Sequence, residues 1–380
     1  MNLEANSPAA SAADPNGRFA PVYRVLTEAI AARAFPGCAF GVLSGGEAVL
    51  QDALGRFTYD EHARAVTAET VYDVASITKV AATTAAAMML YQRGLLDLGT
   101  PLGELLPGFV VGRSSGESAH HVKLHHLLAH NSGLPGYVEL FRSVSTPAGI
   151  YRACLQLPLE SEPGERSEYS DIGFILLGKA LEVLTRESLA TWVRKEVFQP
   201  LGLADTGFCP PAASRSQIPP TEDDASFRRR RMQGEVQDEH AWLLGGAAGH
   251  AGLFSNVQDL LRFAGEILAA FGSGSDAVRP ALFTTETIER FAQRQSPDGS
   301  SRALGWDTPS AESSAGRHFS PHSIGHLGYS GCSLWIDLDA AVAAVLLTNR
   351  TWPDRQSQLI RSVRPAFHDA VREALLSSYK

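Results

Sequence analysis

Strand-like sequence is confined to the two ends of this 380-residue chain, whereas the long middle carries mostly helical patterns. Near the start, two apolar runs meet at Gly45-Gly46, which predicts a β-hairpin. Near the end, two more runs lie on either side of Asp337-Leu338-Asp339. Helical spacing precedes the first hairpin and follows the last strand. The chain is therefore predicted to have an α+β fold, with one antiparallel sheet built from both chain ends and flanked by the terminal helices, beside an all-helical subdomain from the middle.

The expected boundaries follow from the same pattern. Residues 1–18 are small and polar and are predicted to form a disordered N-terminal tail. Residues 19–380 are predicted to form a single domain, long enough for two packed units. An α/β subdomain takes about residues 19–75 and 291–380, and a helical subdomain takes about residues 76–290. A cleft between two such units is a common place for a ligand.

Charge and composition argue against two classes of function. The formal charge is −8 and the isoelectric point is about 5.8, so nucleic-acid binding has no electrostatic support. The one basic run, Arg228 to Arg231, is best interpreted as a solvated loop. No apolar stretch approaches the roughly 18 residues that span a bilayer, and the first residues lack the apolar segment of a secretory signal. Four scattered cysteines favour free thiols, so we expect a soluble, cytoplasmic protein with no nucleic-acid or membrane partner.

One segment carries a candidate nucleophile. From Ser76 to Arg93 the sequence is rich in Ala, Met and Leu and favours a helix, with Lys79 on the same face as Ser76. A serine hydroxyl becomes a nucleophile when a neighbouring base removes its proton. A lysine can be that base only when it is neutral, which requires a pKa lowered by burial or by nearby positive charge. Taken alone, the pattern is more often a helix-capping serine followed by a surface lysine.

A second candidate lies in "PGERSEYSDIGFILLGKALEVL", where a helix is expected to begin near Asp171. Tyr169 then lies in the loop just before that helix, where it could exchange a proton with Lys79 or Ser76. The simpler alternative is a packed tyrosine ring beside an Asp171 helix cap.

A third candidate is "SIGHLGYSGCSLWIDLD", in which glycine recurs every three residues across the start of a strand. Glycine weakens a strand unless a backbone or a ligand must approach closely. His326 and Gly328 would then present an imidazole and backbone donors at a strand edge, and the Tyr329 N–H would join that of Ser76 as an oxyanion hole. The alternative is a bulged strand with a surface histidine.

In this order, Ser76-x-x-Lys79, Tyr169-Ser170-Asp171 and His326-Leu327-Gly328 resemble the three motifs of the penicillin-recognising serine hydrolases. That superfamily includes class C β-lactamases, DD-peptidases, D-aminopeptidases and family VIII carboxylesterases. Segments such as "LLAHNSGLPGY" and "LGGAAGHAGLFSN" are similar to connecting segments of the class C-like branch, and the resemblance covers roughly residues 20 to 375. It implies a β-lactamase/DD-peptidase-like fold and catalysis by Ser76, Lys79 and Tyr169 through an acyl-enzyme, with no cofactor.

Three residues depart from the usual motifs of that superfamily. Asp171 stands where lactamases and DD-peptidases usually carry asparagine, and a carboxylate can only accept hydrogen bonds. His326 stands where typical lactamases carry lysine, so a fixed charge for a substrate carboxylate is lost when the imidazole is neutral. Leu327 removes a hydroxyl that would contact the same carboxylate. Asp171, His326 and Gly328 are therefore predicted to bind a neutral, ester-like substrate.

Three other features give weaker evidence for a functional site. His126 and His130 have a spacing that can bind zinc, but no nearby Cys or carboxylate completes a ligand set, so no metal is expected. By the resemblance, the glycine-rich loop around His250 lines the cleft, where His250 could contact substrate. The Gly-x-Ser-x-Gly string centred on Ser114 lacks the strand that precedes a nucleophile elbow, so a surface loop is favoured.

The sequence therefore predicts a serine hydrolase that acts on carboxylic esters, first of all short-chain ones, with weak β-lactam hydrolysis as a side activity. A β-lactamase or a D-amino-acid or DD-peptidase is the nearest alternative. A penicillin-binding or sensor protein that is acylated without turnover is another, because deacylation depends on how one water is placed. The expected partner is a small-molecule ester or amide, and the sequence leaves the oligomeric state open.

Overall fold

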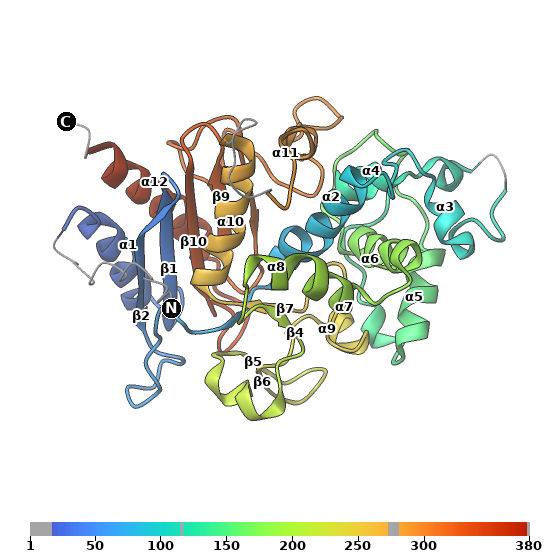
Figure 1. Cartoon of the computed structure of the whole chain (residues 1–380). Coiled ribbons are helices and arrows are strands. Elements are labelled where there is room, and N and C mark those ends of the chain that lie inside the picture. The colour runs from blue at the N-terminus through green and yellow to red at the C-terminus, as the bar shows by residue number, and fades with distance from the viewer. Residues whose placement is uncertain (1–16, 115–116, 273–280, 378–380) are drawn as a thin grey trace, which may run out of the picture.

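Five strands from the two chain ends form one antiparallel sheet in the computed structural model, which describes residues 17–114, 117–272 and 281–377 (Figure 1). The strand order is β2 (Glu47–Gly55), β1 (Gly37–Ser44), β10 (Val342–Thr348), β9 (Ser333–Asp337) and β8 (Ser323–Leu327). β1 pairs with β2 in the predicted hairpin and with β10 on its other side. The predicted sheet is thus confirmed, while most of the predicted tail, residues 1–16, lies outside the described residues.

Strand β10 shows why helices cover both faces of this sheet. All seven of its residues are buried, and alternate side chains point to opposite faces. Ala344 and Leu346 pack in a core with the terminal helices α1 (Ala20–Ala31) and α12 (Ile360–Leu376). Val345 and Leu347 join the larger core on the opposite face, where α10 (Val257–Gly272) packs against β1 and β10 (Figure 1).

The middle of the chain supplies most of the other helices and, in addition, two small sheets. The helices are α2 (Ala85–Gln92), α3 (Leu102–Leu105), α4 (Leu124–Leu128), α5 (Pro147–Gln156), α6 (Asp171–Thr185), α7 (Leu189–Val193), α8 (Gln199–Leu201), α9 (Glu239–Leu243) and α11 (Thr285–Ala292). The sheets are β3 (Tyr72–Asp73) with β7 (Leu253–Ser255) and β4 (Gly207–Phe208), and the hairpin of β5 (Pro220–Asp224) and β6 (Arg230–Gln233). The mixed fold is as predicted, but the middle is not wholly helical. β3, β4 and β7 have two or three residues each, and β5 and β6 are mostly polar, so none of them leaves an alternating apolar pattern in the sequence.

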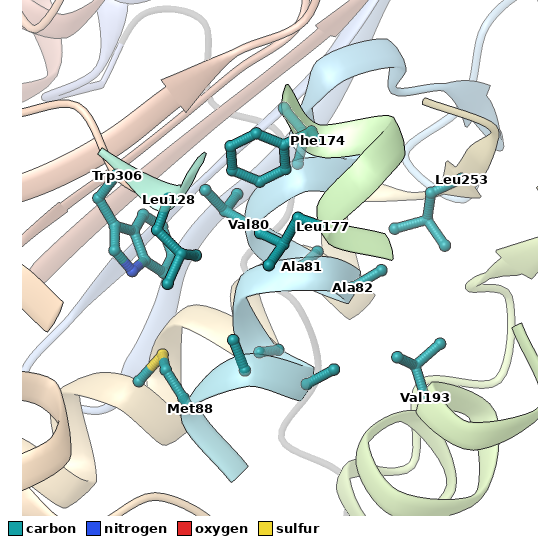
Figure 2. Close-up of a cluster of buried hydrophobic side chains, with 14 of the residues drawn as sticks. Val80, Ala81, Ala82, Met88, Leu128, Phe174, Leu177, Val193, Leu253 and Trp306 are labelled. Carbon is teal, nitrogen blue, oxygen red and sulfur yellow. The ribbon is translucent and has the colours of Figure 1, made fainter. Parts of the chain in front are cut away.

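The segment that follows Ser76 runs through the larger core. A 3₁₀ turn (Ala75–Ile77) leads into a π-helical stretch (Lys79–Thr84) whose six residues are all buried, and then into α2. Figure 2 shows Val80, Ala81 and Ala82 of this stretch among the larger side chains of the core. Because π-helical turns are rare and occur frequently at functional sites, this stretch is a natural place to look for one.

The basic run is not a solvated loop at its first residue. The Arg228 side chain is 1% exposed and pairs with Glu222 at 3.1 Å and with Asp224 at 2.7 Å. Both carboxylates lie in β5, so the expectation was wrong because it did not pair the run with the preceding strand. The two arginines that end the run are exposed and ion-paired, Arg230 with Glu235 just after β6 and Arg231 with Asp223 in β5.

Two further properties concern membrane spans and cysteines. No helix within the described residues is long and apolar enough to cross a membrane. The four cysteines, all within the described ranges, are free thiols.

Candidate active site

A cavity of about 670 Å³ brings the three motifs together. Its lining includes Ser76 from the first motif, Tyr169 and Asp171 from the second, and His326, Gly328 and Tyr329 from the third motif and its neighbour. Lys79 lies fully buried beside Ser76. Residues that are far apart in the chain therefore share one site.

The turn that carries Ser76 is held from several sides. Asp73 accepts hydrogen bonds from the N–H of Ala75 at 2.9 Å and of Gln237 at 2.8 Å, and the Thr78 hydroxyl donates to the Ala75 carbonyl at 2.6 Å. Ala75 has a φ of 48°, in the left-handed region, which costs a non-glycine residue about 1 kcal/mol or more. The surrounding hydrogen bonds maintain this strained backbone directly before Ser76.

The Lys79 ammonium uses all three of its donors. Its Nζ lies 3.1 Å from Ser76 Oγ, 2.6 Å from Asp171 Oδ1 and 3.0 Å from the His250 carbonyl oxygen. Burial, the largest single effect, lowers the pKa of Lys79, but the charges and hydrogen bonds of Asp171 and Tyr169 together raise it above its usual value. The expected neutral amine is therefore wrong: Lys79 is positively charged in the resting site, because a carboxylate lies where the related motifs carry an amide.

Asp171 is available to Lys79 because another residue caps the helix. Ser170 is the N-cap of α6, and its hydroxyl accepts a hydrogen bond from the N–H of Gly173 at 3.0 Å. Asp171 is the first helical residue, where the positive end of the helix dipole favours a carboxylate. The alternative of an Asp171 cap is thus excluded.

Tyr169 lies in the loop before α6, as expected, with a histidine on each side. Its ring centroid is 4.6 Å from that of His130 and 5.8 Å from that of His326. Burial, the largest effect, raises the pKa of Tyr169, and the charge of Lys79 and hydrogen bonds with Lys79 and Ser76 offset this only partly. The phenol is therefore protonated at neutral pH.

His130 was missed as a residue that builds the site. Its Nδ1 accepts a hydrogen bond from the N–H of Ser170 at 2.9 Å, and its ring stacks on Phe174. Burial, together with the charges of Arg302 and Lys79, holds its pKa well below the usual value. This neutral ring fixes the loop of the second motif. The sequence signal for His130 was its place in the "LLAHNSGLPGY" segment, not its spacing from His126. His126 has a separate role, because its Nδ1 accepts a hydrogen bond from the N–H of Lys123.

His326 is buried on the edge strand β8. Its Nδ1 lies 2.8 Å from the Leu327 carbonyl oxygen, so this nitrogen carries the proton. Burial and the charges of Lys79 and Arg302 hold the pKa of His326 well below its usual value, so the ring is neutral. Its Nε2 has no hydrogen-bond partner among the described residues. The third motif thus presents a neutral ring with an unused acceptor, not a cation.

Gly328 and Tyr329 contribute in different ways. A Cβ on Gly328 would lie 2.4 Å from the Val74 carbonyl oxygen, so only glycine allows the end of β8 to pack on the turn before Ser76. The Gly328 N–H donates to Cys332 and its carbonyl accepts from Arg364, so neither group is free for a ligand. Within the described part of the chain, the N–H of Tyr329, in the turn after β8, donates no hydrogen bond.

His250 does not contact the cavity through its ring, contrary to expectation. The side chain is 1% exposed, its Nε2 lies 2.8 Å from Asp238 Oδ1, and it is not part of the cavity lining. The glycine loop before His250 is closely packed, since a Cβ on Gly249 would lie 2.1 Å from the Phe174 carbonyl oxygen. His250 reaches the site only through the carbonyl that binds Lys79.

Ser114 lies outside the lining of the cavity and is exposed. Its N–H donates to the Glu117 carboxylate at 2.7 Å. Residues 115–116, which complete the Gly-x-Ser-x-Gly string, lie outside the described residues.

Comparison with known proteins agrees with this geometry. The Beta-lactamase family model matches residues 22–364. A Salmonella typhimurium protein named "Putative D-alanyl-D-alanine carboxypeptidase" is 30% identical over 349 residues, which cover 83% of this chain and 79% of that protein.

Solved structures share the fold at lower identity. EstCE1, titled a hydrolase with promiscuous acyltransferase activity, has a TM-score of 0.71 and 22% identity, over 93% of this chain and 98% of that one. A class C β-lactamase from Rhodobacter sphaeroides has a TM-score of 0.69 and 18% identity, over 95% of this chain and 99% of that one. With three motifs in one cavity and a family match across most of its length, the chain belongs to the β-lactamase family, whose members are serine hydrolases.

Proposed function

We propose that this protein hydrolyses carboxylic esters, short-chain esters first of all, through an acyl-enzyme formed on Ser76. The observation that carries the proposal is the Ser76 hydroxyl, 3.1 Å from the buried Lys79, in a cavity whose third motif holds a neutral His326. The N–H groups of Ser76 and Tyr329, two residues of the cavity lining, are suited to stabilise the oxygen of a tetrahedral intermediate. A neutral ester needs these donors but no cation for a carboxylate.

Asp171 completes the proton path for the first step. Because Lys79 is already charged, it accepts the Ser76 proton only as it passes its own proton to Asp171, 2.6 Å away. The serine oxygen then bonds to the substrate carbonyl carbon, Lys79 remains an ammonium, and Asp171 becomes a neutral acid. The proton returns through Lys79 to the alcohol oxygen as the ester C–O bond breaks.

Deacylation requires a second acceptor near the acyl group. The Nε2 of His326 lies in the wall of the cavity, carries a lone pair and has no partner among the described residues. We assign it the proton of the attacking water. As the bond between the acyl carbon and Ser76 Oγ breaks, the neighbouring Tyr169 phenol gives its proton to that oxygen and regains one from His326, so the site returns to its resting state.

The proposal is supported by EstCE1, which carries a hydrolase title and shares the fold. A second candidate, carboxypeptidase activity on D-alanyl peptides, is favoured by the name of the Salmonella relative. It is also favoured by Arg361, an exposed cation in the cavity lining that has no ion pair among the described residues. A peptide carboxylate would be attracted to such a cation.

Three substrates separate these functions: p-nitrophenyl butyrate, a D-alanyl-D-alanine dipeptide and a chromogenic cephalosporin. We expect turnover of the butyrate ester, loss of that turnover in Ser76→Ala by at least about 10⁴-fold, and normal turnover in Ser114→Ala. Hydrolysis of only the dipeptide or the cephalosporin would refute the ester proposal. A stable adduct on Ser76, detected by intact-protein mass spectrometry without product release, would instead favour an acylated sensor.

A further inference from the structure

We propose that Asp238, His240 and His250 bind one divalent transition-metal ion with the preferences of zinc, in the wall of the catalytic cavity. One ligand atom from each of these three residues lies within 4.8 Å of the other two. They come from two places in the chain: Asp238 and His240 from the start of α9, and His250 from the glycine loop before β7. The site stands on its own observations and is independent of the ester-hydrolysis proposal.

Several buried ring nitrogens of this cluster have no hydrogen-bond partner among the described residues. His240 is fully buried, and neither of its ring nitrogens has a hydrogen-bond partner among the described residues. The Nδ1 of His250 is also without a partner there. A buried polar atom left without a partner costs about 1–3 kcal/mol, so two adjacent imidazoles in this condition require an explanation. A metal ion accepts the lone pair of one nitrogen from each ring.

Two aromatic rings pack around the buried His240 ring. The Tyr137 ring centroid lies 5.2 Å and the Phe141 ring centroid 5.7 Å from that of His240.

The donor set selects the class of ion. Two imidazole nitrogens and one carboxylate oxygen suit zinc and its neighbours in the first transition row, whereas calcium and magnesium require mostly oxygen ligands. Three protein ligands leave a coordination position open, and Asp238 is itself part of the cavity lining. The proposed ion would therefore lie next to the cavity.

Binding exchanges a proton for the metal. The Nε2 of His250 and Oδ1 of Asp238 lie 2.8 Å apart, a hydrogen-bond distance, so they share a proton. If both atoms become ligands, that proton moves to Nδ1 of His250 when this nitrogen is unprotonated, or leaves for solvent when Nδ1 already carries one. The His250 carbonyl binds Lys79, so the ion is linked to the catalytic site through a single residue.

The test uses the 380-residue chain after treatment with a chelator, titrated with Co²⁺ and then with Zn²⁺. We expect one Co²⁺ per chain with the intense visible absorption of a four-coordinate site, displaced by one equivalent of Zn²⁺. Zn²⁺ should also raise the melting temperature, because it binds the folded state. His240→Ala should weaken binding at least about tenfold, the size of effect expected for losing one of three ligands.

Two controls make the result decisive. His322→Ala removes an exposed histidine that pairs with Asp339, and should bind as the unmodified protein does. All variants carry Cys209→Ser, which removes the exposed thiol. Asp238→Asn tests the site if His240→Ala does not fold, because asparagine preserves both the size of the residue and its cap on α9. Equal binding by a folded His240→Ala or Asp238→Asn, or a site without the four-coordinate spectrum, would overturn the proposal.

Discussion

Two buried acid–base pairs lie side by side in this molecule and differ in how fully their polar atoms are used. Lys79 and Asp171 are 2.6 Å apart, and Ser76 and the His250 carbonyl take the remaining donors of the lysine. The imidazole of His250 and the carboxylate of Asp238 are 2.8 Å apart, but Nδ1 of His250 has no partner among the described residues. The Lys79–Asp171 pair is therefore suited to pass a proton between its own members. The His250–Asp238 pair, with its unused nitrogen, is suited to bind a ligand.

The largest effect is expected from Lys79→Met. It leaves the Asp171 carboxylate, which is 18% exposed in the cavity lining, without its partner, and this should lower the free energy of unfolding by about 1–3 kcal/mol. It also removes the proton relay, so kcat for p-nitrophenyl butyrate should fall at least about a thousandfold. Urea unfolding and steady-state kinetics measure the two losses.

The double variant Lys79→Met with Asp171→Asn is the matched control. Because no unpaired charge remains, most of the lost stability should return while kcat stays low. If stability does not return, the ion pair is not the reason for the loss.

A smaller effect is expected from Asp171→Asn alone, which keeps the size of the side chain and removes the proton acceptor. The kcat should fall about 10²–10⁴-fold near pH 7. The pKa of Lys79 should also fall, because the charge that raises it is gone. The remaining activity should then rise with pH as the lysine becomes neutral, a rise that the unmodified enzyme lacks. A pH–rate profile identical in shape for the two proteins would contradict the relay through Asp171.

The smallest effect at neutral pH concerns a buried imidazole outside both pairs. His368 Nε2 lies 3.0 Å from Ser333 Oγ, and burial lowers the pKa of His368 from 6.5 to about 3. Below pH 6.5 the unfolded chain therefore binds a proton that the folded protein does not, so stability is lost as the pH falls from 6.5 towards 3. The single group contributes about 1.4 kcal/mol per pH unit in that window.

His368→Gln should remove this contribution. Above pH 6.5 the difference in free energy of unfolding between the two proteins should then be constant. Unfolding free energies from urea titrations between pH 4 and pH 8 measure it. Parallel curves across the whole range would show that His368 is protonated equally in both states.

Much of the fold followed from residue pattern because local spacing controls local structure. The Gly45-Gly46 hairpin and the two terminal helices are where the sequence placed them. The packing of α10 on β1 and β10 was not predicted. An apolar helical face indicates that the helix is buried, but it does not show which element packs against that face. The run that begins at Arg228 was misread because its carboxylate partners lie in the preceding strand.

The sequence by itself determined which chemical groups this protein carries and in which order: Ser76 with Lys79, then Tyr169 with Asp171, then His326. Only the tertiary structure decided their states. It places Asp171, 92 residues along the chain, against Lys79 and so keeps the lysine charged, and it buries the His250 ring against Asp238. The physical reason is that a pKa depends on burial and on the distance to other charges, and a linear pattern of residues contains neither quantity.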